Sequence, residues 1–251
     1  MIALITGATA GIGKATAEIF ASHKWDIIIT GRRKTRLDVL ERQLKEKYGI
    51  KVHSLHFDVR NNEEVKKALT TLPEEWKNID LLVNNAGLAA GLSGIQDGSL
   101  ADWEQMIDTN VKGLLYVTRI IAPWMAERKK GHIVNIGSIA GKEVYANGNV
   151  YCATKHAVDA LTKGMRIDLL PYGVKVTQIA PGMVETEFSI VRFKGDEDRA
   201  KNVYKGLEPL RAEDIAETIY WVASRPAHVN INDILIMPAA QANSTTAIRQ
   251  S

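Results

Sequence analysis

The stretch T-G-A-T-A-G-I-G, residues 6–13, lies between the apolar run IALIT at 2–6 and the helix-like segment KATAEIFASH. Its glycines follow the spacing G-x-x-x-G-x-G, at Gly7, Gly11 and Gly13. A glycine-rich turn at the start of a helix lets backbone N–H groups and the helix dipole face an anion such as a pyrophosphate. An ordinary tight turn is the alternative, but a strand before the turn, a helix after it and a second strand next favour nucleotide binding.

Short apolar runs rich in β-branched residues recur along the chain, at 2–6, 26–30, 51–57, 80–84, 132–138, 174–180 and 233–238. Longer amphipathic segments separate them, such as residues 34–49, where Leu37, Leu40 and Leu44 form one stripe and Gly49 marks a stop. Strands that alternate with helices indicate a parallel sheet covered on both faces, and continuously apolar strands are typical of such sheets. We therefore predict an α/β fold: a Rossmann-type doubly wound parallel sheet of about seven strands with helices on both faces.

The chain shows no Pro/Ser-rich linker, internal repeat or low-complexity tract, so we predict one domain over residues 1–251. Two connections look loose, from Gly87 to Ser99 and from Pro181 to about Gly206. In an open α/β sheet the ligand lies beyond the carboxyl ends of the strands, where these loops would border it.

The composition excludes several classes of protein. Of the 251 residues 45% are hydrophobic and 24% charged, as in ordinary globular domains, and the net charge of +3 is dispersed, which disfavours nucleic-acid and membrane partners. No apolar run approaches the ~20 residues of a membrane span, and the initial MIALIT predicts a strand rather than a leader. The single cysteine, Cys152, fits a reducing compartment, so we expect a soluble cytoplasmic protein. His53 and His56 would face opposite sides of a strand, and we expect no metal site.

The pentapeptide YCATK, Tyr151 to Lys155, begins another helix-like segment. Residues at i and i+4 share one helix face, so the Lys155 ammonium can reach towards the Tyr151 ring and lower the cost of a phenolate. A half-buried tyrosine with a lysine stem packed over it is the simpler interpretation of this spacing alone. The rest of the chain decides between these two interpretations.

Five motifs in one order resemble the short-chain dehydrogenase/reductase family along essentially the whole chain. They are the loop at 6–13, NNAG at 84–87, Asn110 in NVKG, Ser138 after a strand, and YCATK, with PG at 181–182 in addition. More narrowly, the chain is similar to NADP-dependent 3-hydroxy acid dehydrogenases that oxidise serine or allo-threonine. That similarity is carried by TGATAG (6–11), TGRR (30–33), LPEEWKNIDLLVNNAG (72–87), SIVRFKGD (189–196) and PAHVNINDILIMP (226–238).

The resemblance implies a catalytic tetrad of Asn110, Ser138, Tyr151 and Lys155. A free tyrosine, with a pKa of about 10, is a weak base at neutral pH, but Lys155 and a positive nicotinamide would favour the phenolate and make Tyr151 the acid/base. Ser138, at the carboxyl end of a strand and thirteen residues before Tyr151, would hydrogen-bond the substrate oxygen, although turn serines are common there. The resemblance further implies that Asn110 holds a water that passes protons to Lys155; an exposed helix asparagine is the alternative.

The residues after the second strand predict the cofactor. An acidic residue there would accept from the ribose 2′-OH of NAD, whereas an arginine accommodates the 2′-phosphate of NADP. This strand ends in Gly31-Arg32-Arg33 with no carboxylate, which favours NADP, although many NADP-dependent relatives carry a basic residue where this chain has Ala10. With the resemblance, the expected cofactor-binding residues are Gly7, Thr9, Ala10, Gly11, Ile12, Gly13, Arg32, Arg33, Asp58, Val59, Asn85, Tyr151, Lys155, Pro181, Gly182, Val184 and Thr186.

We therefore expect an oxidoreductase that transfers hydride between NADP(H) and the 3-hydroxyl or 3-keto carbon of a small hydroxy acid, such as L-serine, L-allo-threonine or 3-hydroxybutyrate. An NADPH-dependent reductase of simple ketones, aldehydes or sugars would use the same tetrad. A non-catalytic NADP-binding regulator is a further alternative, which the loss of a tetrad residue would favour; none is missing. The resemblance also suggests a homotetramer.

Tyr151 and Ser138 would recognise only the reacting oxygen, so selectivity for an acid requires a cationic or hydrogen-bond donor group elsewhere. The segment SIVRFKGD, expected over the nicotinamide, contains Arg192 and Lys194. An arginine fork holds a carboxylate bidentately, so Arg192 is the better candidate. The alternative is an exposed arginine that pairs with Asp196 or solvent.

Overall fold

The computed structural model describes residues 1–250, which form one seven-stranded parallel sheet in the order β3-β2-β1-β4-β5-β6-β7. The strands are β1 Ile2–Ile5, β2 Asp26–Gly31, β3 Val52–His56, β4 Leu81–Asn84, β5 Gly131–Ile136, β6 Val174–Pro181 and β7 Asp233–Ile236. Each strand coincides with one of the seven predicted apolar runs, its ends differing by at most two residues. The predicted doubly wound α/β fold is confirmed.

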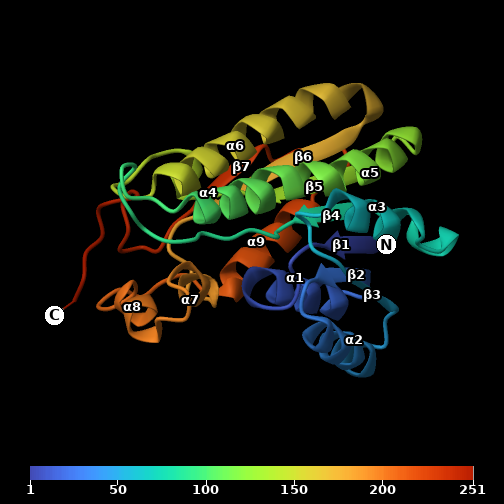
Figure 1. Cartoon of the computed structure of the whole chain (residues 1–251). Coiled ribbons are helices and arrows are strands. Elements are labelled where there is room, and N and C mark those ends of the chain that lie inside the picture. Colours follow the sequence, from blue (N-terminus) through green and yellow to red (C-terminus); the bar gives the residue numbers. More distant parts are fainter. Residues whose placement is uncertain (251) are drawn as a thin grey trace.

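Helices cover both faces of the sheet (Figure 1). On one face lie α1 Gly11–Ser22, α2 Lys34–Tyr48 and α9 Ala212–Ala223. On the other lie α3 Asn62–Thr70, α4 Leu100–Ile107, α5 Gly113–Glu127 and α6 Asn149–Leu169. Two short helices, α7 Phe188–Arg192 and α8 Glu197–Asn202, belong to neither layer. No helix within residues 1–250 combines the length and apolar character needed to cross a membrane.

The strands are buried on both sides, which accounts for their continuously apolar sequences. In β2, Ile27 and Ile29 pack in the core beneath α1, α2 and α9, while Ile28 points into the core on the opposite face. The leucine stripe predicted on α2 is fully buried in the first of these cores. Gly49 ends that helix in the left-handed conformation with φ 65°, which a residue without a Cβ adopts readily.

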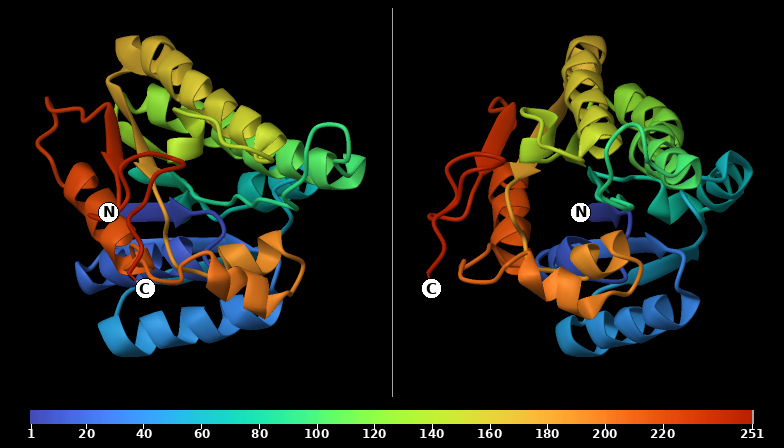
Figure 2. Two further views of the ribbon diagram at one scale, coloured as in Figure 1. Left: turned by 90° about the vertical axis from the view of Figure 1, so that its left-hand side faces the viewer. Right: turned by 60° about the vertical axis from the view of Figure 1, so that its left-hand side comes forward.

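The two connections expected to be loose differ in structure. Residues 87–99 contain no helix or strand, as predicted. The second, after Pro181, is more ordered than expected because it contains α7 and α8, so the prediction was wrong there. Both short helices lie at the carboxyl-end side of the sheet, which faces the viewer in the left panel of Figure 2. The C-terminal segment also contacts this region, since Arg249 donates hydrogen bonds to the carbonyls of Val203 and Lys205.

Candidate active site

A cavity of about 550 Å³ opens beyond the carboxyl ends of the strands, and nearly every predicted site residue lines it. The exceptions are Gly13 and Asn110, which do not line the cavity. A Cβ atom at Gly13 would lie 2.4 Å from the Gly7 carbonyl oxygen, so the start of α1 packs directly against the glycine loop. Gly7 has a φ of 68°, which again favours glycine.

Asn85 supports the glycine loop from below. Its side-chain amide donates to the carbonyls of Thr6 and Gly7 at 2.8 and 3.2 Å, and its backbone N–H donates to the Thr6 hydroxyl. These hydrogen bonds connect the end of β4 to the loop that follows β1, and Asn85 itself lines the cavity. The residues after these two neighbouring strands therefore form one continuous wall of the site.

Tyr151 and Lys155 lie in the first turns of α6 and are almost completely buried, at 8% and 7% exposure. The Lys155 ammonium lies 6.0 Å from the centre of the Tyr151 ring and donates to the Ile136 carbonyl of β5 at 2.9 Å. Burial lowers the pKa of Lys155 to about 8. The one-turn spacing thus places the phenol and the ammonium on one wall of the cavity, as predicted.

Burial raises the pKa of Tyr151 above its ordinary value, although the nearby Ser138 hydroxyl and Arg192 charge oppose this effect. The expectation that Lys155 favours the phenolate is therefore not met by the protein groups alone. The cost of removing a phenolate from water exceeds what these neighbours supply. A phenolate at this position requires further positive charge inside the cavity.

Ser138 follows β5 and caps the short turn Ile139–Gly141, where its hydroxyl accepts from the Ala140 N–H at 3.1 Å. This turn packs against α6 so closely that a Cβ on Gly141 would lie 2.6 Å from the Lys155 carbonyl oxygen. The position of the Ser138 hydroxyl relative to Tyr151 is therefore fixed by direct contact between the turn and the helix.

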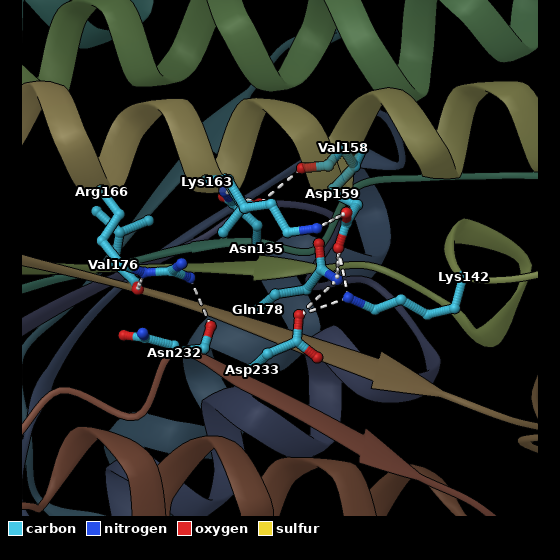
Figure 3. Close-up of polar contacts among 11 residues, drawn as sticks. Asn135, Lys142, Val158, Asp159, Lys163, Arg166, Val176, Gln178, Asn232 and Asp233 are labelled. Atoms are coloured by element: carbon cyan, nitrogen blue, oxygen red, sulfur yellow. Dashed lines mark hydrogen bonds and ion pairs between the residues drawn. The ribbon is translucent and has the colours of Figure 1, made fainter.

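A partly buried ion-pair network ties the same turn to α6 and to the edge strand (Figure 3). The Lys142 ammonium, which follows the turn, pairs with Asp159 of α6 and with Asp233 of β7, the latter at 2.7 Å. Gln178 of β6 donates to both carboxylates, at 2.9 and 3.1 Å. Burial alone would raise the pKa of Asp159, but hydrogen bonds from Lys142, Lys163 and Gln178 outweigh it and lower that pKa to about 2.

Asn110 is buried at 2% exposure, so it is not an exposed helix residue. Its side chain exchanges hydrogen bonds with the backbone of Leu88, both at 2.8 Å, and donates to Thr154 of α6 at 3.0 Å. A π-helical turn, Asp108–Lys112, separates α4 from α5 and contains Asn110. Such turns are frequent at functional sites, and this one lets Asn110 connect α6 to the loop after β4.

The opposite end of the cavity is exposed and basic. Arg32 and Arg33, which follow β2, both line it, and Arg32 lies 3.8 Å from the Asp58 carboxylate. The Arg33 guanidinium donates to the Thr9 hydroxyl from Nε and Nη2 at 3.0 and 2.8 Å. The two guanidinium groups at this end of the cavity can bind an anionic group of a ligand.

Arg192 lies at the end of α7, and its guanidinium lies 5.5 and 5.7 Å from the ring centres of Tyr145 and Tyr151. Its Nε donates to the Gly91 carbonyl at 3.2 Å, and its own carbonyl accepts from the Gly91 N–H at 3.0 Å. Within residues 1–250 it forms no ion pair with Asp196 or any other carboxylate. A half-buried, unpaired cation therefore lies above the phenol.

Comparison with known proteins identifies the family to which this chain belongs. The family model described as short chain dehydrogenase matches residues 1–197. The chain belongs to the short-chain dehydrogenase family.

Individual family members are similar over at least 95% of this chain. The NADP-dependent 3-hydroxy acid dehydrogenase YdfG of Salmonella typhi is 48% identical over 252 residues, covering 100% of both chains. The serine 3-dehydrogenase of Rhizobium radiobacter is 48% identical over 238 residues, covering 95% of this chain and 94% of its own. A closed form of serine dehydrogenase complexed with NADP+ superposes with a TM-score of 0.93 at 47% identity, each chain covered completely. Escherichia coli serine dehydrogenase gives a TM-score of 0.83 at 44% identity, covering 96% and 100%.

Several residues that line this short-chain dehydrogenase site were not predicted. They are contributed mainly by the segment before α6, by the region of α7 and α8, and by the C-terminal segment: Leu88, Tyr145, Glu187, Phe188, Tyr204, Gln241 and Ser244. Gln241 is buried and accepts from the Met183 N–H at 2.9 Å. No motif or hydrophobic period marks these positions. Among residues 1–250, no group of three or more His, Cys, Asp or Glu side chains could hold a metal ion.

Proposed function

We propose that this protein is an NADP-dependent oxidoreductase that transfers hydride to and from C3 of small 3-hydroxy acids, with L-serine, L-allo-threonine and 3-hydroxybutyrate as candidates. The observation that carries the proposal is the position of the Arg192 guanidinium over the Tyr151 ring, in the cavity that also contains Ser138 and Lys155. Relatives named as serine and 3-hydroxy acid dehydrogenases support the same substrate class.

The cavity fits NADP. The glycine loop, with Gly7 and Gly11 at positive φ, presents backbone at the start of α1, where a pyrophosphate is favoured. Arg32 and Arg33 would hold the 2′-phosphate, Asp58 and Val59 would flank the adenine, and Asn85 would lie near the ribose. The segment Pro181, Gly182, Val184 and Thr186 would border the nicotinamide, which supplies hydride acceptance and a positive charge when bound.

Tyr151 would accept the hydroxyl proton of the substrate during oxidation and return it during reduction. Ser138 would hold the same substrate oxygen and stabilise its developing negative charge. The bound nicotinamide would supply the further positive charge that a Tyr151 phenolate requires, and the Lys155 pKa of about 8 suits proton exchange near neutral pH. Asn110 would hold the loop after β4 against α6 through its hydrogen bonds to Leu88 and Thr154. It would also hold the water that connects Lys155 to solvent.

Arg192 would bind the substrate carboxylate. A carboxylate placed beside Arg192 would keep C3 within reach of Tyr151 and Ser138, because the guanidinium lies 5.7 Å from the Tyr151 ring centre. The guanidinium carries five N–H donors, and its bond to the Gly91 carbonyl uses only Nε, so donors on the terminal nitrogens are available for a bidentate bond.

We further propose one catalytic domain over residues 1–251 that assembles as a cytoplasmic homotetramer. All seven strands join one sheet, and the buried Cys152 fits a reducing compartment. Exposed apolar side chains on the outer face of α4 to α6, including Ile107, Leu115 and Ile167, favour burial against further copies. Light scattering of the purified protein tests the tetramer; a monomer at micromolar concentration would contradict it.

A spectrophotometric panel tests the activity. NADP+ reduction is followed with L-serine, L-allo-threonine, 3-hydroxybutyrate and uncharged secondary alcohols, and NADPH oxidation with simple ketones, aldehydes and sugars. We expect the highest kcat/KM with a hydroxy acid. Higher kcat/KM with uncharged ketones or alcohols would support the general reductase instead, and NADP binding without turnover of any of these compounds would support a regulator.

A further inference from the structure

Helix α7 connects the two ends of the cavity. Glu187 immediately precedes its first residue, and Arg192 is its last. The Glu187 carboxylate accepts from Arg33 Nη1 at 2.7 Å and from Arg36 Nη1 at 2.7 and 3.0 Å. One end of this short helix is therefore bound to the basic end of the cavity, and the other places a guanidinium over Tyr151.

Arg33 can make these contacts and bind a phosphate at the same time. A guanidinium has five N–H donors, one on Nε and two on each Nη. Its bonds to Thr9 and Glu187 use one donor on each nitrogen, which leaves one on Nη1 and one on Nη2. Glu187 and a 2′-phosphate thus need not compete for the same N–H groups.

The far end of α7 is also fixed. The backbone of Arg192 is bonded to Gly91, and Lys194 pairs with Asp102 of α4 at 2.9 Å. At the near end, Thr186 packs on the glycine loop, since a Cβ at Gly11 would lie 3.2 Å from Thr186 Cβ. A five-residue helix is about 7.5 Å long, so loss of the Glu187 contacts would leave Arg192 held only by the contacts at its own end of the helix.

We propose that Glu187 is a positioning residue that couples recognition of the cofactor 2′-phosphate by Arg33 to recognition of the substrate carboxylate by Arg192. This inference rests on the proposed function. Its consequence is that a change at the cofactor end, remote from the substrate, alters the preference for acids over uncharged alcohols.

The ion pairs themselves are exposed, at 42% for Arg33, 49% for Arg36 and 43% for Glu187. Pairs of this exposure contribute little to folding stability, so substitutions here should leave the protein folded. The effect of these substitutions should appear in the position of α7, and therefore in the position of the Arg192 guanidinium. We expect a loss of about three- to tenfold in kcat/KM for the hydroxy acid, the scale of one modest ion pair.

The test compares Glu187→Gln with Glu185→Gln, a control in the same loop. Glu185 is exposed and forms no ion pair within residues 1–250. With NADP+, Glu187→Gln should lower kcat/KM for the hydroxy acid about three- to tenfold, with a smaller loss for an uncharged alcohol and no rise in the KM for NADP+. Equal losses on both substrates, or none beyond those of Glu185→Gln, would overturn the proposal.

Arg36→Met provides a second route, because Arg36 contacts Glu187 but does not line the main cavity. It should reproduce the substrate-selective loss, and the double variant with Glu187→Gln should lose less than the product of the two single losses. Multiplicative losses would contradict a shared role.

Hydrogen exchange gives a readout that does not depend on turnover. In NADP+-saturated protein, amides across residues 188–192 should exchange faster in Glu187→Gln than in wild type or Glu185→Gln. Identical exchange in all three would overturn the coupling even if the enzyme oxidises hydroxy acids. Faster exchange in an enzyme without activity on hydroxy acids would instead support the role of Glu187 in holding α7 and contradict the proposed substrate.

Discussion

The two ends of the cavity are built differently. Tyr151 and Lys155 are less than 9% exposed and are held by packing and short backbone contacts, so their environment shifts both pKa values. Arg33 and Glu187 are more than 40% exposed and are held by ion pairs between segments 154 residues apart. In the proposed function, the buried end would supply the proton transfer, whereas exposed charge at the other end would supply selectivity for the cofactor.

The largest effect should come from the buried end. Tyr151→Phe removes the oxygen that would accept the substrate hydroxyl proton, so turnover should fall by ~10²–10⁴-fold or more while NADPH affinity stays close to wild type. Steady-state kinetics and fluorescence titration of NADPH measure the two quantities. Lys155→Met should be similarly damaging and should also weaken NADPH binding.

Tyr145→Phe is the matched control, because Tyr145 also lines the cavity and faces Arg192 but is assigned no proton. It should cost less than about tenfold in kcat, the scale of one lost neutral hydrogen bond. Substantial turnover in Tyr151→Phe, or equal losses in the two variants, would remove Tyr151 from its role.

The exposed end should show a smaller effect confined to one cofactor. Arg32→Ala removes a charge-assisted contact of about 1.5–3 kcal/mol, which corresponds to roughly tenfold to a hundredfold in the KM for NADP. The KM for NAD should barely change. Lys34→Ala, which breaks only the exposed pair with Asp38, serves as the control. Equal effects of Arg32→Ala on both cofactors would show that Arg32 does not recognise the 2′-phosphate.

The network behind Ser138 should have an intermediate character, because it is only partly buried. Lys142→Met leaves Asp159 and Asp233 without their shared cation and should lower the free energy of unfolding by about 1–3 kcal/mol, together with a few-fold loss of kcat. Lys163→Met removes the more exposed partner of Asp159 and should cost less. Urea denaturation at pH 7 measures both; an equal cost would mean that Lys142 has no special structural role.

The same network predicts a small effect of pH. The folded pKa of Asp159, about 2, lies below its ordinary value near 3.8, so this carboxylate contributes stability that is present above pH ~4 and lost as the pH falls towards 2. The stability difference between wild type and Lys142→Met should therefore shrink over that window. A difference that stays constant down to pH 2 would contradict the assignment of the low pKa to this ion pair.

The sequence was most informative where the site depends on residues that are close together in the chain. The strand runs, the glycine loop and the Tyr151–Lys155 spacing are local patterns, and the cavity brings them together as expected. The π-helical turn at Asn110 was missed because its residues continue the helical pattern on either side. Helix α7 was missed because five residues are too few for a hydrophobic period. The contact between Arg33 and Glu187 depends on the three-dimensional path of the connection after Pro181, which no local pattern encodes.

The assignment of substrate selectivity to Arg192 is tested most directly by Arg192→Leu, assayed with NADP+ on L-serine or 3-hydroxybutyrate and on an uncharged secondary alcohol of similar size. We predict that kcat/KM for the acid falls by roughly tenfold to a hundredfold, the value of a charge-assisted bond, while kcat/KM for the alcohol changes little. Equal losses on both substrates, or no loss on either, would contradict the account and assign the carboxylate to another residue.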